Sequence, residues 1–258
     1  MKKFSDMLNA LPLTFRSLLA IWFCSMSAIP IGDWLGMADN ERAVLVSATT
    51  LLFAAAALTV LHGAWGKQRL WRTLGLLLPA TWLVEYVGSQ TGWLFGRYYY
   101  TSLLQPQLGG VPLLIPFAWL TLLPASWTIA NALTGQNQGW RFCLTAAAAF
   151  TSWDLFLDPQ MVKWGLWTWT QPGQYFGIPL HNYLGWFVTA AILTALVRPS
   201  ALPFAPPVLM YALTLAFEFG GLLLLFDLPG PAAVGGLVMG SILLAALYRY
   251  HFKPQHQR

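Results

Sequence analysis

Acidic side chains are rare in this chain of 258 residues, and most of them lie where a charge is costly. Only nine Asp and Glu residues occur, and five of them fall within or at the ends of long apolar segments. An ionised carboxylate inside a bilayer costs at least ~2.5 kcal/mol, so such groups face the protein interior and generally serve a function. Buried carboxyl groups can donate a proton, accept one or stabilise a cation. The five residues are Glu85, Asp154, Asp158, Glu218 and Asp227.

Three of these carboxyl groups are expected at a similar depth in three parallel helices. The separation along the chain between Arg72 and Glu85 equals the separation between Arg141 and Asp154. Because an α-helix rises by a fixed amount per residue, both are roughly 20 Å from the same end of their helices. Glu218 lies about as far into its own apolar segment, which gives a similar depth. We therefore predict that these three groups meet in one reaction site.

Asp158 follows Asp154 by one helical turn, so the two carboxyl groups share a helix face. Pro159 comes next and favours a helix end at Asp158. Two interpretations are open for Asp158 and also for Asp227, which lies at the expected end of another helix. Either residue could belong to the site or, as is also open for Glu85 and Asp154, it could bond Arg97, Lys163 or loop amides as a cap.

A series of glycines follows Glu85 on the same expected helix face. Gly88, Gly92 and Gly96 come after Glu85 at the spacing that keeps side chains on one side of a helix. Small residues allow a second helix to approach closely. We therefore expect Glu85 to point into packed protein rather than into lipid.

Aromatic residues crowd the polar stretches near 97–110 and 159–178, which we expect to fold over the outer ends of the helices. They could form an interfacial belt of the kind common in membrane proteins. However, the spacing glycine-x-aromatic-x-aromatic-threonine occurs twice, and a belt does not require it. Aromatic rings suit a long apolar ligand, and their faces can stabilise a carbocation. The predicted ligand-binding residues are Tyr98, Tyr100, Trp164, Trp167, Trp169, Tyr175, Asn182, Tyr183 and Trp186.

The composition places these residues in a membrane protein. Hydrophobic residues make up 57% of the chain, charged residues make up 9%, and the mean hydropathy is +0.56. A soluble domain carries roughly 25% charged residues. Apolar segments of bilayer length run near 14–36, 43–65, 71–95, 111–132, 140–158, 179–197, 206–227 and 231–249. The expected fold is an all-α integral membrane protein of about eight transmembrane helices, which form a single domain over residues 1–258.

The basic residues predict the orientation of the chain. Eleven of the 14 Lys and Arg residues fall on one side of the expected spans, and three fall on the other. This asymmetry predicts a multi-pass protein of the cell membrane with both termini cytoplasmic. It also accounts for the net charge of +5, so nucleic acid is not an expected partner. Lys2 and Lys3 could begin a signal peptide, but no small-residue cleavage site follows, so we expect residues 14–36 to be the first span.

Two segments of the chain align with each other at a constant offset in the numbering. The matched pairs include Trp71 with Trp140, Glu85 with Asp154, Tyr98 with Trp167, Tyr100 with Trp169 and, after a two-residue gap, Trp119 with Trp186. Both segments begin on the cytoplasmic side, so they predict a parallel repeat of helical hairpins related by an axis along the membrane normal. The repeat units are residues 71–131 and 140–198. A composition rich in Trp and Gly could produce some matches by chance, although the rare acidic residues also fall in register.

The sequence contains no recognisable motif for a cofactor or a metal. It lacks the phosphate-binding, dinucleotide-binding and zinc-protease motifs, and it has no histidine cluster that could bind iron. Cys24 and Cys143 lie inside apolar segments and predict neither a disulfide framework nor a metal cluster. The Asp154-x-x-x-Asp158 pair is similar to the magnesium sites of membrane prenyltransferases, but those enzymes have two Asp-rich motifs and only one such pair occurs here. We therefore expect no cofactor and no metal.

The motifs together resemble one family of membrane enzymes. They are the stretch from Glu85 to Tyr100, Gly110-Val-Pro112, Trp153-Asp154-x-x-x-Asp158-Pro159 and Tyr175-x-Gly177-Ile-Pro179-x-x-Asn182. This combination resembles the CruF-type membrane carotenoid hydratases over residues 71–198. The resemblance implies addition of water to the terminal 1,2 double bond of an acyclic carotenoid, giving a tertiary alcohol without a cofactor. The implied partners are the lipid bilayer and a carotenoid that is lycopene-like, γ-carotene-like or a fifty-carbon compound.

Buried carboxyl groups suit this reaction. Hydration of such an alkene begins with protonation at the less substituted carbon, which needs a carboxylic acid that stays neutral at physiological pH. A second, ionised carboxylate stabilises the tertiary cation and takes a proton from the attacking water. We expect Asp154 to be the acid and Glu85 its partner, with Glu218 or Asp158 positioning the water.

Three other functions remain open on the sequence alone. A lycopene-type cyclase begins with the same protonation but captures the cation with an internal double bond. A proton-coupled transporter would use the carboxylates as a relay, although polar residues are scarce in the cytoplasmic half. A non-catalytic carotenoid-binding protein would keep its function without the carboxylates. The oligomeric state and the particular carotenoid are not predicted.

Overall fold

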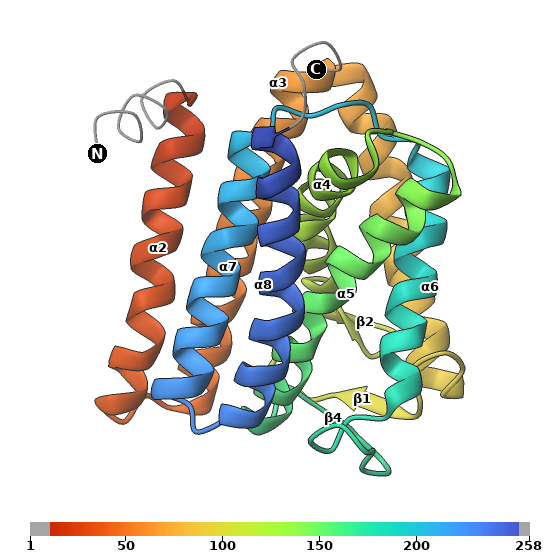
Figure 1. Cartoon of the computed structure of the whole chain (residues 1–258). Coiled ribbons are helices and arrows are strands. Elements are labelled where there is room, and N and C mark those ends of the chain that lie inside the picture. Colours follow the sequence, from red (N-terminus) through yellow and green to blue (C-terminus); the bar gives the residue numbers. More distant parts are fainter. Residues whose placement is uncertain (1–10, 253–258) are drawn as a thin grey trace.

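The computed structural model of the chain describes residues 11–252, which form a helical bundle (Figure 1). The helices are α2 (Leu13–Trp34), α3 (Asp39–Thr91), α4 (Ile115–Thr134), α5 (Trp140–Lys163), α6 (Leu180–Val197), α7 (Ala205–Leu224) and α8 (Pro229–Phe252). Within the described range, α2, α3, α6, α7 and α8 are long and apolar enough to cross a membrane. This is the architecture of an all-α membrane protein, as the sequence predicts.

The longest helix, α3, is interrupted at Gly66. The backbone there has φ 73° and ψ 172°, a conformation that glycine adopts at little steric cost. The break falls between the apolar segments 43–65 and 71–95 of the sequence. Figure 1 places it at the end of the bundle where α2 begins and α8 ends.

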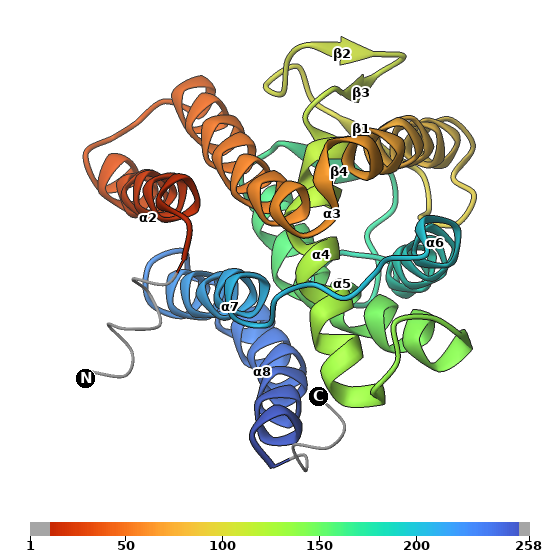
Figure 2. The same cartoon turned by 90° about the horizontal axis from the view of Figure 1, so that it is seen from above.

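Helix α4 occupies the centre of the bundle, surrounded by the other helices (Figure 2). Nearly all of its side chains are buried, including the polar residues Thr121, Ser126 and Thr128. Neighbouring helices shield α4 from lipid, so its sequence need not be uniformly apolar. This position explains why a helix of 20 residues falls outside the set that is apolar enough to span a membrane unaided.

Four short strands occupy the loops that connect the helices, and the sequence pattern did not predict them. Strand β1 (Tyr98–Tyr100) pairs antiparallel with β4 (Trp167–Trp169), and β2 (Gln107–Leu108) pairs with β3 (Val111–Pro112). Figure 1 shows β1 and β4 at the opposite end of the bundle from the break in α3. These strands hold the two aromatic loops against each other.

The pairing of β1 with β4 follows the constant offset found in the sequence. The pair at the middle of the ladder is Tyr99 with Thr168, and these two positions have the same offset as Glu85 and Asp154. The hydrogen bonds on either side of the ladder are consistent with this register. Thr101 N donates to Leu166 O at 3.0 Å, and Thr170 N donates to Arg97 O at 2.9 Å. The ladder therefore has a local two-fold axis that exchanges the two loops.

Helix α5 continues past Pro159 to Lys163, so the predicted helix end at Asp158 is wrong. A proline inside a helix lacks the N–H that would bond the carbonyl four residues earlier, here Leu155 O. The Tyr175 hydroxyl donates to this carbonyl at 3.0 Å. A side chain from the loop after β4 thus replaces the missing backbone bond.

Replacing Tyr175 by Phe should lower the free energy of unfolding by about 1 kcal/mol, because Leu155 O loses its donor in a partly buried position. Tyr183→Phe is a matched control. The centroids of the Tyr175 and Tyr183 rings lie 5.1 Å apart, but the buried Tyr183 hydroxyl has no hydrogen-bond partner in the described part of the chain. Thermal unfolding of both variants in detergent would test this difference. Equal transition temperatures would show that the Leu155 carbonyl does not depend on Tyr175.

The glycine series after Glu85 does not form a helix-packing face, which corrects the sequence-based expectation. Helix α3 ends at Thr91, and Gly92 and Gly96 adopt φ of 76° and 83° in the turns that follow. Only Gly88 lies within the helix. A Cβ atom added there would collide with the Phe95 ring, so the space beside Gly88 is filled by the returning chain rather than by another helix.

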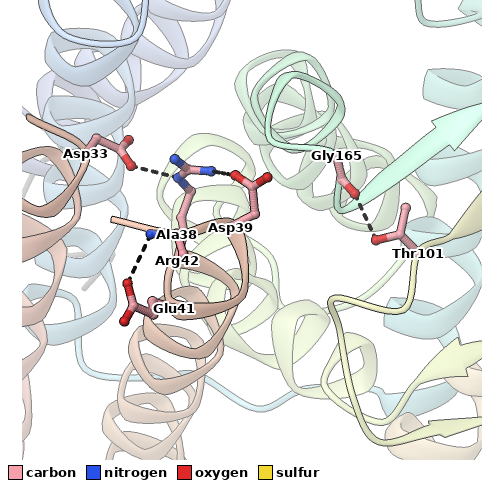
Figure 3. A network of polar contacts seen from close by, with 7 residues as sticks. All are labelled: Asp33, Ala38, Asp39, Glu41, Arg42, Thr101 and Gly165. Atoms are coloured by element: carbon pink, nitrogen blue, oxygen red, sulfur yellow. Dashed lines mark hydrogen bonds and ion pairs between the residues drawn. The ribbon is translucent and has the colours of Figure 1, made fainter. Parts of the chain in front are cut away.

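The turn between α2 and α3 is fixed by charged groups. Arg42 Nε bonds Asp33 Oδ1 at 2.7 Å, and Arg42 Nη1 bonds Asp39 Oδ1 at 2.6 Å (Figure 3). The same view shows Thr101 Oγ1 donating to Gly165 O at 2.8 Å, a contact between the two aromatic loops. These bonds organise the end of the bundle that carries the strands.

Candidate active site: an aromatic cavity with buried carboxyl groups

A cavity of about 540 Å³ lies between α2, α3, α4, α5, α6 and α7. Its walls are mostly apolar and aromatic, and β1 and β4 contribute to them. Glu85, Asp158 and Glu218 line this cavity. The structure therefore brings together three of the four carboxyl groups predicted to form a site.

Glu85 is surrounded by hydrogen-bond donors and is only 3% exposed. The Tyr98 and Tyr100 hydroxyls both donate to Oε2, the latter at 2.9 Å. Trp119 Nε1 donates to Oε1 at 3.0 Å. These donors come from β1 and α4, so the strand and the central helix together position the carboxyl group of α3.

The two tyrosines beside Glu85 keep their protons. Burial, followed by the nearby charge of Glu85, raises the pKa of Tyr98 and of Tyr100 well above the usual value for a phenol. Both hydroxyls are therefore available as donors at physiological pH. Three donors on one carboxyl group stabilise its negative charge.

Asp154 and Asp158 form a buried pair on α5, with exposures of 0% and 2%. Asn182 Nδ2 donates to Asp154 Oδ2 at 3.0 Å and to Asp158 Oδ2 at 2.5 Å. Trp167 Nε1 donates to Asp158 Oδ1 at 3.0 Å. The two carboxyl groups also lie within hydrogen-bonding reach of each other, and Glu85 is near enough to act on both electrostatically.

Asp154 does not line the cavity, although the sequence predicted it to be the acid. It shares the Asn182 amide with Asp158, and its Oδ1 has no partner in the described part of the chain. Two negative charges so close together repel each other, so the two carboxyl groups do not both ionise readily. The pair is therefore suited to sharing one proton. Asp158 is the member that faces the cavity.

The other two acidic residues have different surroundings. Glu218 is 7% exposed, and its Oε1 accepts a hydrogen bond from Trp153 Nε1 at 3.3 Å. Asp227 is exposed and lies 3.8 Å from Lys163 Nζ. Asp227 therefore belongs to the helix-end ion pair that the sequence left open, and not to the cavity. Within residues 11–252, no group of three His, Cys, Asp or Glu residues is arranged to hold a metal ion.

Seven of the nine predicted ligand-binding residues line the cavity. They are Tyr98, Tyr100, Trp164, Trp167, Trp169, Asn182 and Trp186. Tyr175 and Tyr183 do not line it, and the Tyr175 ring packs against that of Tyr183 on α6. Tyr175 has the structural role at Leu155 described above.

Several aromatic residues of the cavity were not predicted as ligand contacts. Trp119 stacks on Trp186 with ring centroids 4.5 Å apart, and Trp153 meets Trp186 edge-on at 6.3 Å. Trp22 stacks on Phe53 at 4.2 Å in the part of the cavity between α2 and α3. Trp119 had a signal in the sequence, because it matches Trp186 in the repeat. Trp22 and Phe53 lie in ordinary apolar segments and gave none.

The fold and the site define an all-α membrane protein whose buried carboxyl groups face an aromatic cavity. The family model described as "Carotenoid biosynthesis protein" matches residues 44–242, and the chain belongs to this family.

A bisanhydrobacterioruberin hydratase from Haloarcula japonica is similar to this chain, with 33% identity over 132 residues. The match covers 48% of this chain and 45% of that protein, so this chain spans less than half of the relative's length. No solved structure matches the chain.

Proposed function

We propose that this protein is a carotenoid hydratase that adds water to the terminal 1,2 double bond of an acyclic carotenoid. One observation carries the proposal. A carboxyl group held by three donors and a pair of carboxyl groups that can share a proton lie together among aromatic rings. Membership of the carotenoid biosynthesis family supports a carotenoid substrate, and the name of the relative supports a hydration reaction.

The geometry favours Asp158 as the proton donor. Asp158 lines the cavity, whereas Asp154 does not. A proton shared by the pair can pass to the less substituted carbon of the alkene, leaving a tertiary cation and two ionised aspartates. Asp154 then acts as a positioning residue, since it keeps a proton on Asp158 before the reaction.

Glu85 suits the role of the ionised partner. Its three donors offset part of the cost of burying its charge, and that charge stabilises the cation through the apolar cavity. The faces of Trp119 and Trp186 add cation–π stabilisation. When water attacks the cation, Glu85 accepts the released proton, and transfer back to the aspartate pair restores the starting state. The net reaction is alkene plus water to tertiary alcohol.

Glu218 remains as the residue that positions the water. It lines the same cavity and has a single hydrogen bond, from Trp153, in the described part of the chain. The other carboxylate oxygen is free to accept from a water molecule.

Isotope labelling tests the reaction itself. Purified protein given lycopene in heavy-oxygen water should form an alcohol whose hydroxyl carries the label, with no nucleotide or molecular oxygen supplied. In deuterated water, one deuterium should enter at the carbon next to the alcohol. Deuterium uptake without oxygen uptake would instead identify a cyclase. Absence of any product would contradict an enzymatic role.

We further propose eight spans with both termini on the cytoplasmic side of the cell membrane. The break at Gly66 would divide α3 into two spans, and the segments 71–131 and 140–198 would form a parallel repeat. The constant offset, which recurs in the β1–β4 ladder, supports this symmetry. A cysteine placed at Tyr99 should react with an impermeant reagent from outside the cell, and labelling only from the cytoplasmic side would contradict the topology.

A further inference from the structure

Within the described residues, the exposed part of the cavity lining lies on one side of the protein. Its exposed lining residues are Ala216, Leu224 and Leu225, and all three lie on α7 or at its C-terminal cap. Leu224 is 76% exposed and Leu225 is 61% exposed. Every other lining residue is buried or half-buried.

The opposite edge of this opening is the outer half of α2. Met26, Ser27 and Pro30 line the cavity there and are half-buried. Helix α2 and α7 are neighbours in both views of the bundle (Figures 1 and 2). The opening is therefore a slot between the outer halves of two helices, and its rim is almost entirely apolar.

Helix α2 is attached to the bundle mainly through α3. It packs along the first half of α3, and Arg42 ties its outer end through Asp33. Toward α7, its ring contacts are those of Phe217 with Trp22 at 5.3 Å and with Phe23 at 5.1 Å. No hydrogen bond joins α2 to α7 within residues 11–252, so apolar contacts alone close this side.

Small residues leave room along the slot. Gly220 lines the cavity one turn from Phe217, and a Cβ atom added there would meet nothing within 4 Å. A cavity of about 540 Å³ holds a molecule of ordinary ligand size. A polyene chain longer than such a molecule must therefore extend out of the cavity, and only an apolar route suits it.

We propose that the slot between α2 and α7 is a lateral entrance from the bilayer for the polyene chain of a carotenoid. The reacting end group lies among Glu85, Asp158 and Glu218, and the rest of the chain passes Gly220 into the lipid. The Phe217 ring closes the slot when it is empty. The identity of the occupant rests on the proposed function, whereas the route rests on the exposed apolar rim.

The experiment fills the slot with bulky side chains. Gly220→Trp and Ala216→Trp place an indole at the opening, and Leu223→Trp is the control because Leu223 lies on the same helix but outside the cavity. Each variant is expressed with a lycopene pathway and purified, and elution as a single species on gel filtration establishes folding. Two quantities are then measured: lycopene retained per protein, and alcohol formed from lycopene in liposomes.

Both slot variants should retain at least about tenfold less lycopene than the unmodified protein and form alcohol at least about tenfold more slowly, while Leu223→Trp stays within about twofold. Normal retention of lycopene by folded Gly220→Trp and Ala216→Trp would contradict the proposed entrance. If the unmodified protein retains lycopene but makes no alcohol, the hydratase proposal fails, and loss of retention in the slot variants still establishes the route.

Discussion

Replacing Glu85 by Gln should reduce the rate of hydration by about 10²–10⁴-fold, the range associated with loss of a general acid or base. The amide keeps the shape of the side chain but carries no charge to stabilise the cation and cannot accept a proton from water. The variant should still fold, because the Tyr98 and Tyr100 hydroxyls can turn to accept hydrogen bonds from the new amide. Retention of lycopene should therefore be near normal while alcohol formation is lost.

Glu41→Gln is the matched control for this substitution. Glu41 is an exposed glutamate on the same helix, and it accepts a bond from Ala38 N at 3.0 Å. Its replacement should leave turnover unchanged. Turnover close to normal in Glu85→Gln would remove this residue from the mechanism, even if the variant bound lycopene more weakly. A loss of binding alone would indicate a structural role for the cluster around Glu85.

The sequence predicted which carboxyl groups are buried, because the cost of a charge in lipid constrains their positions strongly. Glu85, Asp154, Asp158 and Glu218 are all buried as expected. Depth along a helix follows from a fixed rise per residue, so counting from the basic residues predicts it. The two aspartates share one face of α5, so which of them lines the cavity depends on the side chains that pack over that face. For this reason the sequence could not show that Asp158 lines the cavity and Asp154 does not.

The hydrogen-bond donors around the carboxyl groups were harder to predict. Tyr98 and Tyr100 lie on a strand of three residues, which is too short to show an alternating pattern. Their pairing with β4 depends on a contact between two loops that are far apart in the chain. Similarly, the rule that a proline ends a helix failed at Pro159 because a distant hydroxyl, that of Tyr175, satisfies the free carbonyl.

The glycines after Glu85 show a further limit of periodicity. Their spacing fits a helix face, but it fits equally a helix end followed by two tight turns. The positive φ angles of Gly92 and Gly96 show that this segment forms turns rather than a continued helix. This difference matters for the site, because ending α3 at Thr91 allows the chain to return and place Tyr98 against Glu85.

The two aspartates should respond differently to replacement by Asn. Asp158→Asn removes the proton donor that faces the cavity, so hydration should fall by about 10²–10⁴-fold at every pH. In Asp154→Asn, Asp158 is still present. The new amide keeps the bond from Asn182 but carries no negative charge, so the like-charge repulsion that favours a proton on Asp158 is lost.

Asp154→Asn should therefore be slow at neutral pH and should recover as the pH falls, because a lower pH returns the proton to Asp158. The profile of rate against pH in liposomes, measured for both variants and for the unmodified protein, tests this difference. If Asp158→Asn recovered at low pH while Asp154→Asn stayed inactive, Asp154 would be the acid, as the sequence first indicated. Equal and complete loss in both variants at every pH would mean that the pair acts only when both carboxyl groups are present.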